Sequence, residues 1–244
     1  MNDKGRQATS ESSGLAPHLP VFVFVHDLRQ PLRAIVAALQ RTLQQPGDFP
    51  AGTREQLAMA LQFAFGQGEL MAAALEYESA RAGETLEPRE VPLFMAIDAA
   101  CLKLEPMRKT SGANIRLPSG PVRHPVPAVL TRVLEKVLHN ALKFHAPGTS
   151  PEVNVETRSG PNSGFEVRIT DNGIGIDARY RQKVFEPFGR LNSSASYPGS
   201  GLGLAICRTL LASNGGSIDI EDREDRASGI TVVLKVAASS HPSS

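Results

Sequence analysis

The sequence predicts a helical hairpin followed by an α/β domain. From about residue 22 to residue 75, apolar residues recur at steps of three and four, which is the pattern of amphipathic helices. Beyond about residue 85, short segments with strand composition alternate with helical ones. We therefore expect a disordered segment over residues 1–18, the hairpin over 19–84, the α/β domain over 85–237 and a polar tail over 238–244.

Composition and charge are those of an ordinary globular protein large enough for two domains. Of its 244 residues, 41% are hydrophobic and 21% are charged, and a net charge of +1 gives no field that would recruit nucleic acid or a membrane surface. Cys101 and Cys207 lack the spacing of a disulfide framework or a thiolate metal site, so we expect reduced thiols in a cytoplasmic protein. The apolar run Val21–Val25 is too short to cross a bilayer, so no direct membrane span is predicted.

The first predicted helix carries one histidine beside its apolar seam. The seam consists of Phe22, Val25, Leu28, Leu32, Ile35, Leu39 and Leu43. His26 should face solvent, Gln30 shares its face one turn later, and Pro31 should bend the helix. A neutral imidazole followed by the carboxylate of Asp27 is a competent phosphoryl acceptor, because the carboxylate can take up the released proton. A lone histidine on a helix is more often a surface or packing residue, so this interpretation depends on the rest of the chain.

The second predicted helix runs from an N-cap at Thr53 to about Ala82. Gly66 and Gly68 weaken it by roughly 1 kcal/mol each. Two antiparallel helices leave one apolar stripe uncovered. A homodimer that forms a four-helix bundle is the economical way to bury that stripe.

The α/β domain is predicted from strand-like runs and helical periods. The expected strands are Glu90–Leu93, Asn114–Leu117, Glu152–Thr157, Phe165–Thr170, Ser217–Glu221 and Ile230–Val236. The expected helices are Ile97–Met107, Pro127–Phe144, Ala178–Val184 and Leu202–Ser213.

Two segments of this domain carry groups suited to a nucleotide. Asn140 and Lys143 lie about one turn apart on a helix, where an amide oxygen is a neutral hard ligand for Mg²⁺ and a lysine can meet phosphate oxygens. Asp171 directly follows a strand, and a buried carboxylate there can accept a hydrogen bond from an adenine amino group. Gly173 and Gly175 would let the backbone pass close to the base.

Two further segments would close over the phosphates and bind them. Phe185 and Phe188 suit the anchoring of a mobile loop over residues 189–198, which would be a lid. A glycine cluster then runs into an amphipathic helix, whose backbone donors and dipole form an anion site for polyphosphate. The cluster contains Gly199, Gly201, Leu202 and Gly203.

Each of these segments also has a simpler explanation. Asp-Asn-Gly is a common turn, a glycine repeat alone is a weak signal, and an asparagine in a helix is usually polar surface. The order of the four segments and their strand and helix context favour a nucleotide site. A dinucleotide-binding fold does not fit, because no strand leads directly into Gly199 and no early βαβ unit is present.

Together, five motifs resemble those of the transmitter region of a bacterial sensor histidine kinase of two-component signalling. The segments similar to the family's H box, N box, first glycine box, F box and second glycine box are, in order, His26–Leu32, Asn140–Phe144, Asp171–Gly175, Phe185–Phe188 and Gly199–Leu204. The resemblance covers nearly everything from residue 22 to residue 236, and the set of motifs is highly specific.

The resemblance implies a dimerisation and phosphoacceptor hairpin followed by a Bergerat-type α/β sandwich that binds ATP and Mg²⁺. His26 would be the phosphorylated residue and Asp27 its general base. The chain would pass the phosphoryl group to an aspartate on the receiver domain of a response regulator. Positioning and charge neutralisation would supply most of the catalysis.

The resemblance also assigns roles in the ATP site. Asn140 would ligate Mg²⁺, Lys143 would touch phosphate, and Asp171 would read adenine. Arg190, just after the F box, is a further candidate for a phosphate contact. The remaining positions would shape the base pocket or permit lid closure: Gly173, Gly175, Phe185, Phe188, Gly199, Gly201, Leu202 and Gly203.

Two positions depart from the family pattern. Lys136 stands where many members have a second asparagine, and a cation there could either meet phosphate or weaken Mg²⁺ binding. Gln30 stands where members that also dephosphorylate their partner often have Thr or Asn, which leaves a phosphatase activity open.

Two other functions remain possible from the sequence. Lys136 motivates a degenerate phosphotransfer or scaffold protein that binds a response regulator but does not turn over ATP. A serine kinase of the same ATPase superfamily is the third reading, although such relatives lack a hairpin with a histidine box. No sensor domain fits in the first twenty residues, so the signal would come from a separate sensor protein or from an N-terminal sensor region missing here.

Overall fold

A computed structural model describes residues 19–47, 49–83, 90–120, 122–159, 164–191, 197, 199–225 and 227–236. The predicted terminal segments over 1–18 and 238–244, the domain boundary at residues 84 and 85, and most of the predicted lid over 189–198 lie outside these ranges.

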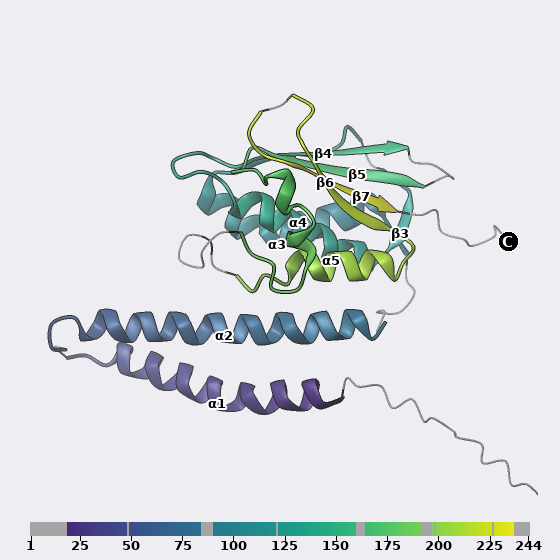
Figure 1. Ribbon diagram of the computed structural model, residues 1–244. Helices are drawn as coiled ribbons and strands as arrows, with labels where there is room; N and C mark the ends of the chain where they lie inside the picture. Colours follow the sequence, from purple (N-terminus) through teal and green to yellow (C-terminus); the bar gives the residue numbers. More distant parts are fainter. Residues whose placement is uncertain are drawn as a thin grey trace, which may run out of the picture.

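The predicted hairpin is confirmed. Helix α1 (Leu19–Gln44) and helix α2 (Thr53–Arg81) lie side by side (Figure 1). Pro31 lies inside α1, which remains one helix but bends along its length in Figure 1. Gly68 lies at the contact between the two helices, where a Cβ would make an ordinary van der Waals contact of 3.6 Å with a methyl carbon of Leu32.

The hairpin does not cover its whole apolar seam within one chain. Val25 is buried, whereas Leu28 is 37% exposed and Ile35 is 52% exposed. On α2, Phe63 is 67% exposed. The apolar surplus predicted from the sequence is therefore present on the described helices.

A five-stranded sheet forms the centre of the second domain. Its spatial order is β2 (Asn114–Arg116), β4 (Glu152–Ser159), β5 (Phe165–Asp171), β7 (Thr231–Val236) and β6 (Ser217–Glu221). β2 runs parallel to β4, and the other neighbours are antiparallel. A separate antiparallel pair joins β1 (Glu90–Pro92) to β3 (Pro125–Pro127). The sequence missed β3, because two prolines around one valine give no strand alternation.

Three helices cover one face of this sheet. They are α3 (Leu93–Ser111), α4 (Val129–Lys143) and α5 (Gly203–Ala212), and α2 packs against α5 from the outer side (Figure 1). The core between helices and sheet includes Leu134, Leu138, Ile169 and Leu234, all fully buried. One face of α4 is buried in this core, so its opposite face can carry polar groups. Both cysteines are free, as expected, and Cys207 is buried.

Two expected helices differ from those observed. The helix expected over Ala178–Val184 is wrong: the chain forms two short 3₁₀ turns, Ala178–Tyr180 and Lys183–Phe185. The carboxylate of Asp177 accepts the backbone N–H of Arg179 and two of its side-chain donors, which favours a tight turn over a continuing helix. The helix expected over Ile97–Met107 is longer, because it begins directly after Pro92 and ends only at Gly112, where φ is +64°.

Candidate active site

A cavity of about 670 Å³ opens between α4, the end of β5, the β6–β7 loop and the segment before α5. This volume lies within the range of small-molecule and cofactor sites. Eight of the predicted site residues line the cavity: Asn140, Lys143, Asp171, Gly175, Arg190, Gly199, Gly201 and Gly203. The structure therefore brings residues of all four predicted segments to one place, and Arg190 is the contribution of the segment that contains the predicted lid.

One end of the cavity is apolar. It is lined by Ile169, Ile174, Ile176, Ile220, Ile230 and Val232. These branched side chains offer the flat apolar walls between which a planar base can pack.

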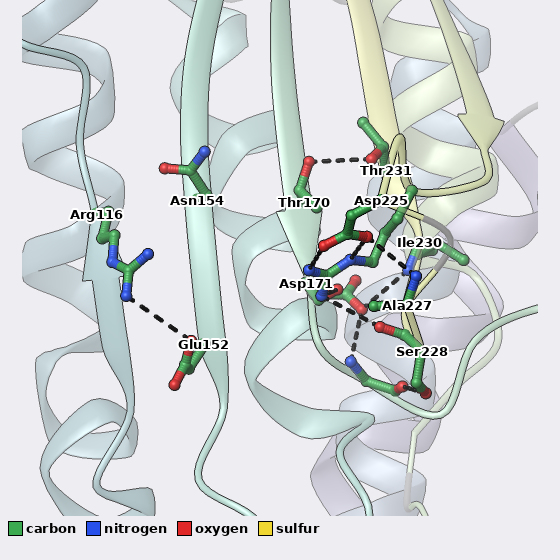
Figure 2. Close-up of polar contacts among 12 residues, drawn as sticks. Arg116, Glu152, Asn154, Thr170, Asp171, Asp225, Ala227, Ser228, Ile230 and Thr231 are labelled. Carbon is green, nitrogen blue, oxygen red and sulfur yellow. Dashed lines mark hydrogen bonds and ion pairs between the residues drawn. The ribbon is translucent and has the colours of Figure 1, made fainter.

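Asp171 provides the polar group at this apolar end. Its side chain is only 7% exposed, and its Oδ1 accepts hydrogen bonds from the backbone N–H of Gly173 (2.9 Å) and of Ile230 (3.3 Å) (Figure 2). Burial raises the pKa of this carboxyl, while the two backbone donors and the charge of Arg223 lower it. Within the described part of the chain, no hydrogen bond reaches Oδ2, so this oxygen can accept one from a ligand.

The backbone beside Asp171 requires glycine. A Cβ at Gly173 would lie 2.5 Å from the carbonyl oxygen of Phe144. At Gly229, in the β6–β7 loop, φ is +110° and a Cβ would lie 1.9 Å from the carbonyl oxygen of Asp171. Neither position can accept a side chain without moving the strand end that carries the carboxylate.

The other end of the cavity is cationic. A Cβ at Gly199 would lie 2.8 Å from the Nζ atom of Lys143, so the ammonium group touches the glycine segment. Arg190 donates to the carbonyl oxygens of Gly199 (2.8 Å) and Tyr197 (3.1 Å). Burial, followed by the positive charge of Arg190, lowers the pKa of Lys143, and Glu69 opposes this effect. Two neighbouring cations beside the N-terminus of α5 make an anion-binding end.

Asn140 is the candidate ligand for a divalent cation. Its half-buried side chain lines the cavity on the same helix as Lys143. Among the residues that the structure describes, no group of three His, Cys, Asp or Glu side chains could hold a metal. An amide oxygen at a phosphate-binding end still fits Mg²⁺, which protein sites often hold through few side chains, substrate phosphates and water.

Lys136 is not an isolated cation beside this site. Its Nζ lies 2.8 Å from Oε2 of Glu76 on α2, and Oε1 of Glu76 accepts a hydrogen bond of 2.8 Å from Arg132. Although burial raises the pKa of Glu76, its bonds to Lys136 and then Arg132 leave this pKa below its usual value. Glu76, on the hairpin, therefore offsets the charge of Lys136, for which the sequence alone indicates no partner.

The other predicted site residues lie away from the cavity wall. Phe185 is buried in the core, Leu202 is fully buried, and Phe188 is 61% exposed with φ at +62°. Gly173 acts through Asp171, as described above. These positions support the neighbouring segments rather than the cavity itself.

The predicted phosphoacceptor residues lie on α1, outside the cavity. The side chain of His26 is 71% exposed, and its Nδ1 is 3.4 Å from Oδ1 of Asp27. Gln30 is exposed on the same helix. His26 is thus accessible to a reacting phosphate and beside a carboxylate.

Sequence reasoning missed several residues of the site. Glu69 and His139 line the cavity, and Arg223, Ser228 and Gly229 surround the backbone of Asp171. Ser-Gly before a strand is a turn signal. Nothing local in the sequence connects this turn to a carboxylate more than fifty residues earlier.

Comparison with known proteins gives the class of this domain. Residues 126–238 match the family of histidine kinase-, DNA gyrase B- and HSP90-like ATPases. Sensor protein KdpD of Rathayibacter rathayi is 37% identical over 112 residues, which are 46% of this chain and 13% of the relative. The signal transduction histidine-protein kinase/phosphatase MprB of Mycobacterium ulcerans (strain Agy99) is 41% identical over 95 residues, 39% of this chain and 18% of the relative.

The hairpin and the domain together also match solved structures. Full-length ShkA in complex with AMPPNP superposes with a TM-score of 0.68 at 19% identity, over 92% of this chain and 47% of that chain. This likeness extends the shared fold to the helical region. Residues 126–238 are therefore similar to the histidine kinase-, DNA gyrase B- and HSP90-like ATPases, the relatives that match this segment include a histidine-protein kinase, and the hairpin and the domain together share their fold with a solved structure.

The chain spans less than a fifth of the length of these two curated relatives. In the described residues, no helix combines the length and apolar character needed to cross a membrane.

Proposed function

We propose that this chain is an ATP-dependent protein-histidine kinase that phosphorylates His26 and passes the phosphoryl group to an aspartate of a response regulator. The observation that carries the proposal is the cavity that joins an apolar end, with the free Oδ2 of Asp171, to a cationic end at Lys143 and Arg190. An adenine base and a triphosphate have this same division of apolar and anionic parts. The exposed His26 supplies the acceptor.

The residues would divide the work as follows. Asp171 accepts a hydrogen bond from the adenine amino group, while Lys143, Arg190 and the N-terminus of α5 bind the phosphates. Asn140 would hold Mg²⁺, which supplies neutralisation of phosphate charge when bound. The chemistry itself requires mainly positioning.

The transfer step uses the pair on α1. Asp27 orients the Nδ1–H of His26, so that Nε2 carries the free electron pair. Nε2 attacks the terminal phosphorus, the bond from this phosphorus to the bridging oxygen breaks, and ADP leaves. Asp27 accepts the Nδ1 proton, which leaves a neutral phosphohistidine. The phosphoryl group then moves to an aspartate carboxylate of the receiver domain.

The hairpin is proposed to dimerise into a four-helix bundle, because its exposed apolar residues lack cover in one chain. A non-catalytic scaffold that binds a response regulator is the second candidate. Lys136 still favours it, since that cation replaces a family asparagine. The ion pair with Glu76 weakens this argument by offsetting the charge.

The decisive experiment is autophosphorylation of the full chain with labelled ATP and Mg²⁺. We expect an acid-labile, base-stable label that is lost in His26→Ala and retained in His124→Ala, which alters a histidine stacked on Phe165. Purified receiver domains should then remove the label. Persistent labelling of His26→Ala would refute the assignment.

Asp171→Asn tests the adenine contact separately. Its remaining oxygen can still accept the loop hydrogen bonds, but its NH₂ group would face the base amino group. We expect calorimetry to show a fall in ATP affinity of about 10- to 100-fold, because the amide NH₂ and the adenine amino group are both hydrogen-bond donors. ATP binding by the wild type without any labelling would favour the scaffold, and unchanged affinity in Asp171→Asn would remove Asp171 from the base site.

A further inference from the structure

The loop between β6 and β7 is fastened to the strand end that carries Asp171. Arg223 Nη1 donates to the carbonyl oxygen of Asp171 (3.0 Å) and to that of Ser228 (3.2 Å). Ser228 Oγ donates to the carbonyl oxygen of Gly173 at 2.7 Å. Asp171 and Ile230 are joined twice, since Asp171 N donates to the Ile230 carbonyl (3.0 Å) and Ile230 N donates to Asp171 Oδ1 (3.3 Å).

Arg223 is itself held by a second residue of the loop. Its Nε and Nη2 donate to the two carboxylate oxygens of Asp225 at 2.9 and 2.6 Å, and Oδ1 of Asp225 also accepts the backbone N–H of Ala227 (Figure 2). A bidentate pair of this kind fixes the plane of the guanidinium. The third nitrogen, Nη1, is thereby aimed at the backbone of the base pocket.

The same loop supplies part of the pocket wall. Ile230 lines the apolar end of the cavity, directly beside the Asp171 carboxylate. The distance between this wall and the free Oδ2 of Asp171 decides whether a base with an amino group at the right edge can fit. Arg223 bonds to the backbone of both Asp171 and the β6–β7 loop, but it does not itself line the cavity.

We propose that Arg223 is a positioning residue of the base pocket, which fixes the β6–β7 loop and the Asp171 carboxylate in the spacing that selects adenine. This inference rests on the proposed function, because it takes an adenine nucleotide as the ligand. The guanidinium charge also favours the ionised form of Asp171, so its loss should raise the pKa of that carboxyl.

The test compares ATP and GTP binding by the full chain in calorimetry. Arg223→Gln should weaken ATP binding about tenfold and reduce the preference for ATP over GTP, which lacks the 6-amino group. Arg223→Lys should restore part of the preference, since one ammonium can reach one carbonyl. Asp225→Asn keeps Arg223 but weakens the ion pair that holds it. This variant should reduce the preference for ATP over GTP, as Arg223→Gln does, by a smaller factor.

Arg179→Gln is the matched control. Arg179 forms a similar pair with Asp177, through Nε at 3.1 Å and Nη2 at 2.9 Å, but its side chain is 76% exposed and its recorded bonds go to Asp177 rather than to Asp171. Its nucleotide preference should equal that of the wild type. Thermal unfolding of every variant measures how much of the protein is folded. Loss of folded protein lowers the bound stoichiometry, whereas loss of the positioning contact changes the ATP-to-GTP affinity ratio.

The pH profile is the second readout. In Arg223→Gln, the loss of ATP affinity on acidification should begin at a higher pH than in the wild type, because Asp171 takes up a proton more readily. If the affinity ratio and this profile match those of the wild type, the positioning role is overturned while the proposed function stands. If the wild type binds no ATP, the proposed function fails and this inference fails with it.

Discussion

His139 lies in the cavity wall, on the helix turn between Lys136 and Lys143. Although His139 as a residue is exposed, partial desolvation of its imidazole at the cavity wall lowers its pKa, the charges of Lys143 and then Lys136 lower it further, and Glu135 and Glu69 oppose the shift. The folded protein therefore favours neutral imidazole. The cations proposed to bind phosphates also disfavour an additional proton on His139.

A pH prediction follows at this position. Since the folded pKa of His139 is below its usual value of about 6.5, the unfolded chain takes up the proton first as pH falls. The stability that neutral His139 contributes is present above pH 6.5 and is lost as pH falls through the folded pKa. His139→Gln cannot titrate, so its melting temperature should decline less between pH 7.5 and 5.5 than that of the wild type. Identical slopes in calorimetric melts would contradict this prediction.

At the scale of elements, α2 and α4 meet through charge. Glu76 on α2 faces Arg132 and Lys136 on α4, with side chains 23%, 29% and 24% exposed. Glu69, on the same α2 helix, reaches the cavity lining. The hairpin thus places acids against α4, the helix proposed to bind the phosphates, and these acids lower the positive potential at that end of the cavity.

Glu76→Gln should therefore strengthen ATP binding. Without the carboxylate, Lys136 at the cavity wall is no longer neutralised, and the affinity should rise about two- to threefold at low salt. The gain should diminish at high salt, because mobile ions screen the added charge. Calorimetry at two salt concentrations measures both effects. Glu55→Gln, which alters an exposed acid in the first turn of the same helix, should leave the affinity unchanged.

Local patterns predicted most elements, and contacts between distant segments account for most of what they missed. The buried leucines of α4 recur at helical spacing, so its existence and its polar side could be read from the sequence. Asn140, Lys143 and Asp171 stand in short motifs, so the sequence could predict them as candidate site residues, and all three line the cavity. Arg223 contacts Asp171, and Glu76 contacts Lys136, only in the folded chain. No local sequence pattern predicts such contacts between distant residues. The sequence pattern did not predict the two turns over residues 178–185, because side-chain hydrogen bonds at Asp177 compete with helix formation.

At the scale of the whole molecule, exposed apolar residues lie on both parts of the described chain, and five of them lie on the two long helices of the hairpin. They are Leu28, Ile35, Met59, Phe63 and Phe65, with exposed fractions of 37%, 52%, 54%, 67% and 49%. A surface of this kind, on two long helices, fits a second copy of the hairpin. The core of the α/β domain lies between its sheet and helices, and Ala80 of α2 belongs to the same buried cluster.

Phe63→Glu tests this assembly. A charge at the proposed interface cannot be buried without a partner, so sedimentation should show a shift from dimer toward monomer, by at least tenfold in the dissociation constant. Leu102→Glu, at a 76% exposed leucine on α3, is the control and should leave the dimer intact. A monomeric wild type would refute the proposed bundle.

The order of the layers limits how the proposed phosphoryl transfer could occur. Figure 1 shows α2 between α1 and the ATPase domain, so the helix with His26 is the farther one from the nucleotide cavity. Helix α2 therefore stands in the straight path from the cavity to α1. If the proposed function holds, transfer to His26 would require the α/β domain to move around the hairpin or a histidine from another copy, and the arrangement described here would be a resting state.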